Sequence, residues 1–145
     1  MTQTRRLLFG LALAGLTRPA AARVNHAGGV AVHGVDVVSY RTDGGPRGGS
    51  AAFGRVHGGA EWHFASEVHR ARFTAAPDAF LPRFGGFCAF GVAEGYLVDV
   101  DPAAWDIVDG RLYLNFSLAV RRRWRRDIAG NIRRAEANWP RLMAG

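Results

Sequence analysis

The stretch AAFGRVHGGAEWHF, residues 51–64, decides the fold class of this chain of 145 residues. Two apolar segments, at 51–56 and 60–64, flank the tripeptide HGG at 57–59. Short loops that contain glycine connect antiparallel strands, because glycine adopts the positive φ angles that tight turns need. The stretch therefore predicts a β-hairpin.

A second hairpin is predicted at residues 107–116, where the dipeptide DG at 109–110 separates two apolar segments. Residues 96–100 are apolar and predict a further strand. Asp101 precedes Pro102, a pair that favours the cap and first position of a helical turn. We therefore expect a strand, a helical turn and a hairpin in succession.

Serines predict where the main helices begin. Ser66 and Ser117 each precede a helical pattern, and a serine hydroxyl can accept a hydrogen bond from the first helical turn. Residues 118–139 carry apolar side chains at helical spacing, with a possible break at Gly130 and an end at Pro140. The predicted class is α+β, in which a small antiparallel sheet with hairpins packs against several short helices and a C-terminal helical segment.

Residues 1–22 have the pattern of an export signal, with a charged start, ten apolar residues at 7–16 and alanines at 20–22. The apolar run is too short to cross a bilayer of about 30 Å as a helix. The pair Arg5-Arg6 is similar to that of twin-arginine signals. An ordinary secretory signal and a retained N-terminal anchor are the alternatives.

Cleavage of this signal would leave a protein that is periplasmic or otherwise exported. Residues 23–29 are then expected to form a flexible lead-in, and residues 30–142 a single domain. The length of the chain allows one compact domain with a sizeable core.

The basic charge is concentrated at the two ends of the chain. The whole chain has 19 arginines, no lysine and a net charge of +7. Residues 23–110 carry 7 arginines and 10 acidic residues, whereas residues 111–145 carry 9 arginines and 2 acidic residues. The lack of lysine excludes Schiff-base and phosphate-loop lysines. The single cysteine excludes an intramolecular disulfide and multi-cysteine metal sites.

Five blocks of sequence occur in a fixed order along residues 31–140. They are AVHGVDVVSY (31–40), WHFAS (62–66), GGFCAFGV (85–92), DPAAWDIVDGRLYLN (101–115) and NWP (138–140). In these blocks the chain resembles the small exported YHS-domain proteins of bacteria. The resemblance covers most of residues 30–142 and implies one YHS-like domain that includes the basic C-terminal helical segment.

The wider YHS superfamily includes metal-handling modules with three motif cysteines. At the corresponding positions this chain has His33, Ala65 and His69. The resemblance implies that His33, His69 and Cys88 come together, with Asp36 as a further ligand or an orienting carboxylate. Imidazole and thiolate ligands suit zinc and copper. The alternatives are that Cys88 is a buried core residue and that both histidines lie in turns or at the surface.

The arginine run at residues 121–126 is the second candidate site. On a helix, 100° per residue spreads these arginines around most of the circumference, while Trp124 faces inward. The run is then a solvated face, or it binds a partner protein or an anionic membrane surface. Its basic residues are Arg121, Arg122, Arg123, Arg125 and Arg126. We expect no nucleic-acid partner for an exported protein.

The sequence thus predicts a non-enzymatic binding module for a metal ion, zinc or copper, or for a small ligand. The first alternative is a structural or interaction module that uses its arginine-rich C-terminal helix. The second is an enzyme that uses the same predicted pocket near His33, His69 and Cys88, although no catalytic residues are predicted.

Overall fold

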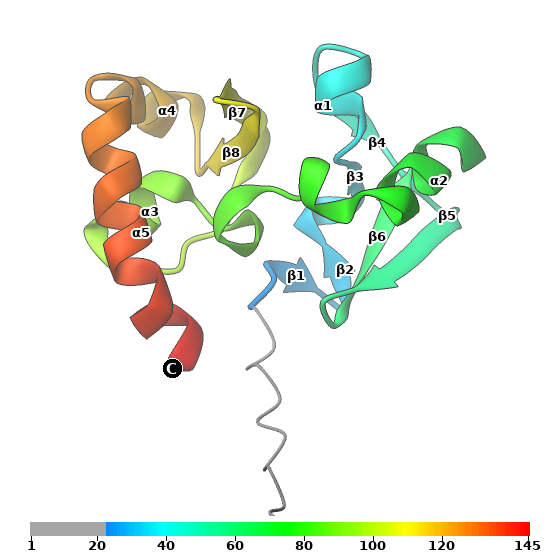
Figure 1. The fold of residues 1–145 in the computed structure, drawn as a ribbon, viewed down its shortest axis with the longest axis horizontal. Coiled ribbons are helices and arrows are strands. Elements are labelled where there is room, and N and C mark those ends of the chain that lie inside the picture. The colour runs from blue at the N-terminus through cyan, green and yellow to red at the C-terminus, as the bar shows by residue number, and fades with distance from the viewer. Residues whose placement is uncertain (1–22) are drawn as a thin grey trace, which may run out of the picture.

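The hairpin predicted at residues 51–64 is confirmed. In the computed structural model, which describes residues 23–145, it consists of strands β5 (Ser50–His57) and β6 (Ala60–Phe64). Two short strands, β1 (His26–Ala27) and β2 (Val30–Ala31), extend it to a sheet in the order β1-β2-β6-β5 (Figure 1). β2 is parallel to β6, and the other neighbours are antiparallel. The predicted export signal, residues 1–22, lies outside the described residues.

Residues 23–29 do not form the flexible lead-in that the sequence predicted. The backbone N–H of Asn25 donates to the Gly85 carbonyl at 2.9 Å. The Asn25 side chain donates to the Gly86 carbonyl at 3.1 Å, across 61 residues of sequence. Strand β1 follows directly and pairs with β2. Long-range hydrogen bonds, which no local sequence pattern reveals, therefore hold this segment in place.

The chain turns sharply after β2. The short elements here are the 3₁₀ helix η1 (Val32–Gly34), β3 (Val35–Asp36), helix α1 (Ser39–Thr42) and β4 (Arg47–Gly48), which pairs with β3. Val32 and His33 have φ angles of +45° and +56°, which residues with a Cβ rarely adopt. Such a backbone persists only where its surroundings hold it. Val32 is buried, and a Cβ built on Gly86 would lie only 2.6 Å from Val32 Cγ2.

Ser66 caps helix α2 as predicted. Its hydroxyl accepts a hydrogen bond from the backbone N–H of His69 at 3.2 Å. The helices from here to the middle of the chain are α2 (Glu67–Ala75), the 3₁₀ helices η2 (Pro77–Ala79) and η3 (Arg83–Gly86), and α3 (Ala89–Glu94).

The second hairpin forms, but the two elements predicted before it do not. Residues 96–100 are irregular, and Asp101 begins strand β7 (Asp101–Val108), which pairs with β8 (Arg111–Asn115). The Asp101 carboxylate does accept the N–H of Ala103 at 2.9 Å, the local bond expected of a cap. The strand register shifts between Asp101 and Trp105. This irregularity accommodates the local bond, so pairing with β8 prevails over the predicted helical turn.

The C-terminal helical segment consists of α4 (Leu118–Arg125) and α5 (Ile128–Ala144). The break falls at Asp127 instead of Gly130, because the Asp127 side chain caps α5 by accepting the N–H of Gly130 at 3.0 Å. The predicted end at Pro140 is also wrong, since α5 continues to Ala144. Trp139 and Leu142, on either side of this proline, pack against a hydrophobic cluster that holds the last turns.

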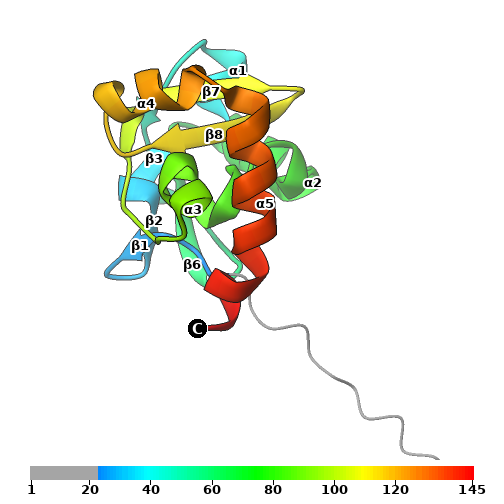
Figure 2. The ribbon, with the colours of Figure 1, turned by 90° about the vertical axis from the view of Figure 1, so that its left-hand side faces the viewer.

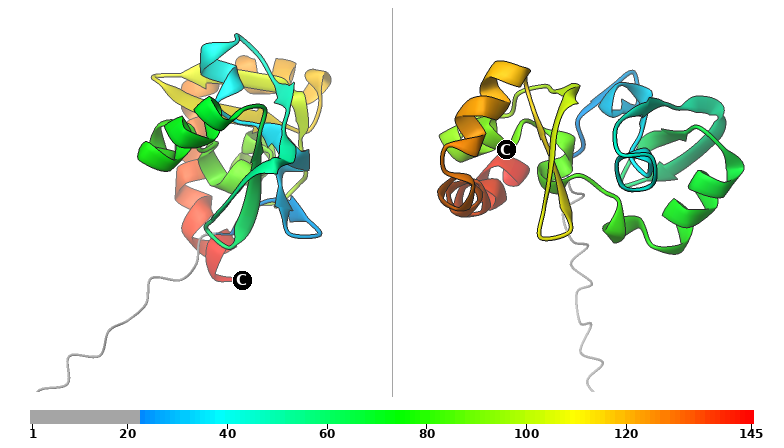
Figure 3. Two further views of the ribbon diagram at one scale, coloured as in Figure 1. Left: turned by 90° about the vertical axis from the view of Figure 1, so that its right-hand side faces the viewer. Right: turned by 90° about the horizontal axis from the view of Figure 1, so that it is seen from above.

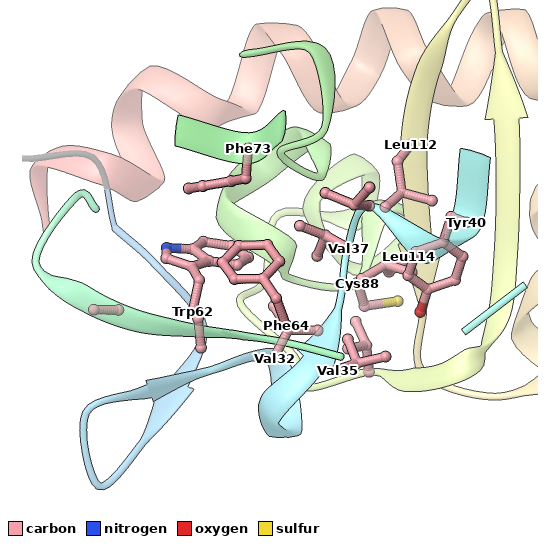
Figure 4. Close-up of a cluster of buried hydrophobic side chains, with 14 residues drawn as sticks. Val32, Val35, Val37, Tyr40, Trp62, Phe64, Phe73, Cys88, Leu112 and Leu114 are labelled. Carbon is pink, nitrogen blue, oxygen red and sulfur yellow. The ribbon is translucent and has the colours of Figure 1, made fainter. Parts of the chain in front are cut away.

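Strand β8 divides the interior into two hydrophobic clusters. Leu112 and Leu114 face the first cluster with Trp62 and Phe64, as Figure 4 shows. Tyr113 points to the opposite face and packs in the second cluster, beneath the C-terminal helices. This alternation follows from the two-residue period of a β-strand. Strand β8 therefore connects the part of the molecule built from strands β1–β6 with the part built from helices α3, α4 and α5.

The elements are arranged accordingly in space. Strands β1–β6 with α1 and α2 lie on one side, which we call the sheet half. Helices α3, α4 and α5 lie on the other side, the helical half (Figure 1). Seen from above, the β7–β8 hairpin stands between them (Figure 3). α5 packs along α3 (Figure 2). No helix between residues 23 and 145 is both long enough and apolar enough to cross a membrane.

Candidate functional site

Asp36 is a fully buried carboxylate that joins three segments of the chain. One oxygen accepts the backbone N–H groups of Val38 at 2.9 Å and Ser39 at 3.3 Å. The other oxygen accepts the backbone N–H of Ala65 at 2.9 Å and Nδ1 of His69 at 2.6 Å. All of these groups are donors, so the negative charge is compensated within the protein.

His69 is oriented by this carboxylate. Asp36 accepts from Nδ1, and the other ring nitrogen, Nε2, lies 3.3 Å from the hydroxyl of Thr42. The same orientation prepares many histidines to bind a metal or to exchange a proton. The structure thus brings together two of the four predicted site residues, Asp36 and His69.

His33 belongs to a different group of residues. Its Nε2 lies 2.9 Å from Oδ1 of Asp99, which also accepts the side-chain N–H of Asn25 at 2.8 Å and the backbone N–H of Val100 at 2.7 Å. Partial burial opposes ionisation of Asp99, but hydrogen bonds from Asn25, Val100 and His33 outweigh it and lower the pKa of this carboxyl. His33 therefore belongs to a surface contact with Asp99.

Cys88 lies in the first hydrophobic cluster (Figure 4). Its sulfur accepts the backbone N–H groups of Gly91 at 3.4 Å and Phe116 at 3.3 Å, and lies 3.5 Å from Oδ1 of Asn115. Burial raises the pKa of the thiol, and the backbone hydrogen bonds only partly oppose this effect. Cys88 thus caps α3 and links it to the end of β8.

The predicted metal site is therefore not assembled from His33, His69, Cys88 and Asp36. Across residues 23–145, no three histidine, cysteine, aspartate or glutamate side chains lie close enough to share a metal ion. The physical reason is that His33 and Cys88 are held by partners distant in sequence, at separations of 66 and 27 residues. The residues present do not fit a three-ligand zinc or copper site.

The arginine run at 121–126 is largely occupied by contacts within the protein. Arg121 and Arg125 both pair with Asp106, at 3.3 Å and 2.6 Å. Asp106 is only 9% exposed, so these pairs fasten α4 to β7. Arg123 lies over the ring of Phe90, 5.0 Å from its centroid. Arg122, Arg123, Arg125 and Arg126 are exposed, and of these Arg122 and Arg126 make no ion pair or contact with an aromatic ring within residues 23–145.

A pocket of about 460 Å³ is the feature that the sequence analysis missed. Its walls include Val24, Trp62 and Leu81, which belong to or pack on the first hydrophobic cluster, and Phe84 and Trp139 of the second. It therefore lies where the sheet half and the helical half of the molecule meet. Its charged lining residues are Arg23, Arg41, Arg83, Arg111 and Asp78.

The wall of this pocket around Gly85 is tightly constrained. Phe84 and Gly85 have φ angles of +58° and +63°, so this turn is left-handed. A Cβ on Gly85 would overlap the carbonyl oxygen of Arg23, and it would lie 3.4 Å from Cη2 of Trp139. Only glycine therefore allows Arg23 and Trp139 to converge at this point of the wall.

Arg83 extends along the same wall. Its guanidinium lies 5.3 Å from the centroid of the Phe84 ring, and its Nη2 lies 3.3 Å from Glu136. Its Nε is buried and has no hydrogen-bond partner within the described part of the chain. A buried donor without an acceptor is costly, so this group favours an additional acceptor nearby.

Comparison with protein-family models, with curated proteins and with solved structures finds no match to this chain. The YHS resemblance thus rests on the sequence blocks alone and stays a prediction. The pocket left no sequence signal, because its four arginines are scattered between residues 23 and 111 without a motif.

Proposed function

We propose that the protein is an exported, non-enzymatic, YHS-like module that binds a small anionic ligand in the pocket between its two halves. The observation that carries this proposal is the lining of the pocket, where four arginines face a single acidic residue, Asp78. The guanidinium group matches carboxylate and phosphate oxygens in pairs, so arginines around a cavity favour an anion. The export part of the proposal rests on the sequence pattern of residues 1–22.

The size and composition of the pocket support a small organic ligand. Its volume of about 460 Å³ lies within the range of ordinary ligand sites, which are mostly apolar with a few polar groups. Arg83 adds to this support, because it lines the pocket and its side chain is 34% exposed. Of the two predicted ligand classes, metal ion and small ligand, the second is the better supported.

Calorimetric titration of the purified protein with inorganic phosphate, pyrophosphate and citrate tests the proposal. We expect at least one of these anions to bind with a dissociation constant below about 1 mM. The double variant Arg41→Gln/Arg111→Gln removes two exposed pocket arginines and should weaken binding at least tenfold.

Arg122→Gln/Arg126→Gln is the matched control, because it removes the same charge from exposed residues of α4 and its C-cap. This control should change affinity less than twofold at 0.15 M salt, where distant surface charges are screened. The proposal fails if none of the three anions binds, or if the two double variants weaken binding equally.

A further inference from the structure

The pocket has apolar walls as well as positive charge, and these walls narrow the chemical class of ligand that would bind. Besides its arginines, the wall is formed by aromatic and aliphatic side chains, including Trp62, Phe84, Trp139, Leu81 and Val24. An inorganic anion would occupy only a small part of about 460 Å³ and would leave the partly exposed members of this wall, Trp139, Leu81 and Val24, in contact with water. The wall therefore favours a ligand with an apolar part of its own.

The aromatic side chains are held in place before any ligand arrives. Trp62 is 1% exposed, and its Nε1 donates to the His57 carbonyl at 3.0 Å. The Phe84 ring lies between Tyr113 and Trp139, with centroids 6.1 Å and 5.7 Å away. Because these rings are fixed by the two hydrophobic clusters, ordering them on binding costs little free energy.

Charge and aromatic surface lie next to each other in this wall. The Arg83 guanidinium is stacked over the Phe84 ring, and the Trp139 ring approaches the turn at Gly85 that also contacts Arg23. A ligand that contacts both kinds of surface must carry its negative group directly on, or very close to, its apolar part. Planar rings suit such a site, because they stack on guanidinium planes and contact aromatic edges.

We infer that the ligand is a small aromatic anion, with a carboxylate or phosphate group on or beside a planar ring. This inference rests on the proposed function and adds the ring to it. In the bound state the oxyanion contacts the pocket arginines, and the ring lies against Trp139.

Three phosphates test the inference by calorimetry. Phenyl phosphate carries the proposed ring, cyclohexyl phosphate carries a saturated ring of similar size, and inorganic phosphate carries none. Phenyl phosphate should bind at least tenfold more tightly than inorganic phosphate and at least threefold more tightly than cyclohexyl phosphate.

Two tryptophan variants locate the ring. Trp139→Leu should remove most of the preference for phenyl phosphate while inorganic phosphate still binds. Trp105→Leu is the matched control, because Trp105 packs on Tyr40 and does not line the pocket. If Trp139→Leu does not fold, as judged by circular dichroism, nuclear Overhauser contacts between phenyl phosphate and the Trp139 indole of the unaltered protein replace it.

The outcomes separate the two proposals. Equal affinity for phenyl and inorganic phosphate overturns the aromatic ligand but leaves the anion site. Equal affinity for phenyl and cyclohexyl phosphate, or an equal effect of the two tryptophan variants, also overturns it. If none of the three phosphates binds, and pyrophosphate and citrate do not bind either, the anion site itself is refuted.

Discussion

Replacing Asp36 by asparagine should destabilise the fold strongly, although the two side chains have the same shape. The carboxylate accepts four hydrogen bonds, from Val38 and Ser39 on one oxygen and from Ala65 and His69 on the other. An amide has only one acceptor oxygen, so in either orientation its NH₂ faces two donors.

The magnitude follows from these contacts. Each hydrogen bond lost to a charged acceptor costs about 1.5–3 kcal/mol, so two lost bonds cost about 3–6 kcal/mol. His69 can recover part of this by switching tautomer and accepting from the amide. We therefore expect Asp36→Asn to lower the free energy of unfolding by about 2–4 kcal/mol, a large part of the 5–15 kcal/mol of a typical domain.

Urea unfolding at pH 7, followed by tryptophan fluorescence, measures this loss. The control is Asp43→Asn, which has the same chemistry in an exposed residue that pairs with Arg47 at 2.9 Å. An exposed pair contributes little, so the control should cost much less than Asp36→Asn. A loss of less than about 1 kcal/mol for Asp36→Asn, or equal losses for both variants, would refute the structural role of the buried carboxylate.

Three further predictions concern the pH dependence of stability, thiol reactivity and packing. The lowered pKa of Asp99 stabilises the fold above the ordinary aspartate pKa of about 3.9, and this contribution is lost as the pH falls through the lowered value. The stability difference between the unaltered protein and Asp99→Asn should thus be larger at pH 6 than at pH 3, and urea titrations that give equal differences contradict this. The buried Cys88 thiol, with its raised pKa, should react with iodoacetamide at pH 8 at least ~100-fold more slowly in the folded protein than in urea; comparable rates contradict its burial. Gly86→Ala should cost about 1–3 kcal/mol more than Gly44→Ala in thermal or urea unfolding. Both glycines have positive φ, but only at Gly86 does a Cβ meet the side chain of Val32; equal costs contradict this packing.

The parts of the fold that the sequence predicted correctly are those with a local cause. The hairpin at 51–64 follows from a glycine turn between two apolar segments, and α2 begins where the Ser66 hydroxyl can cap it. Asp101 shows where such reasoning fails. The same side-chain bond to a nearby N–H serves a helix cap and a strand irregularity, and only pairing with β8 decides between them.

The candidate site was predicted less completely, for a related reason. The pair of Asp36 and His69 forms, but His33 contacts Asp99 and Cys88 contacts Asn115. No spacing in the sequence indicates these partners. The pocket was even harder to predict from the sequence, because its arginines come from segments that meet only when the two halves of the fold pack together.

Nuclear magnetic resonance of the arginine side chains tests the anion site most directly. The Nε–Hε signals of the purified protein, with the tryptophan indole signals, would be followed during titration with phenyl phosphate. We predict saturable shifts for Trp139 and for the pocket arginines, which are Arg23, Arg41, Arg83 and Arg111. Shifts confined to exposed arginines such as Arg122 and Arg126, or no saturable shift at all, would contradict the account.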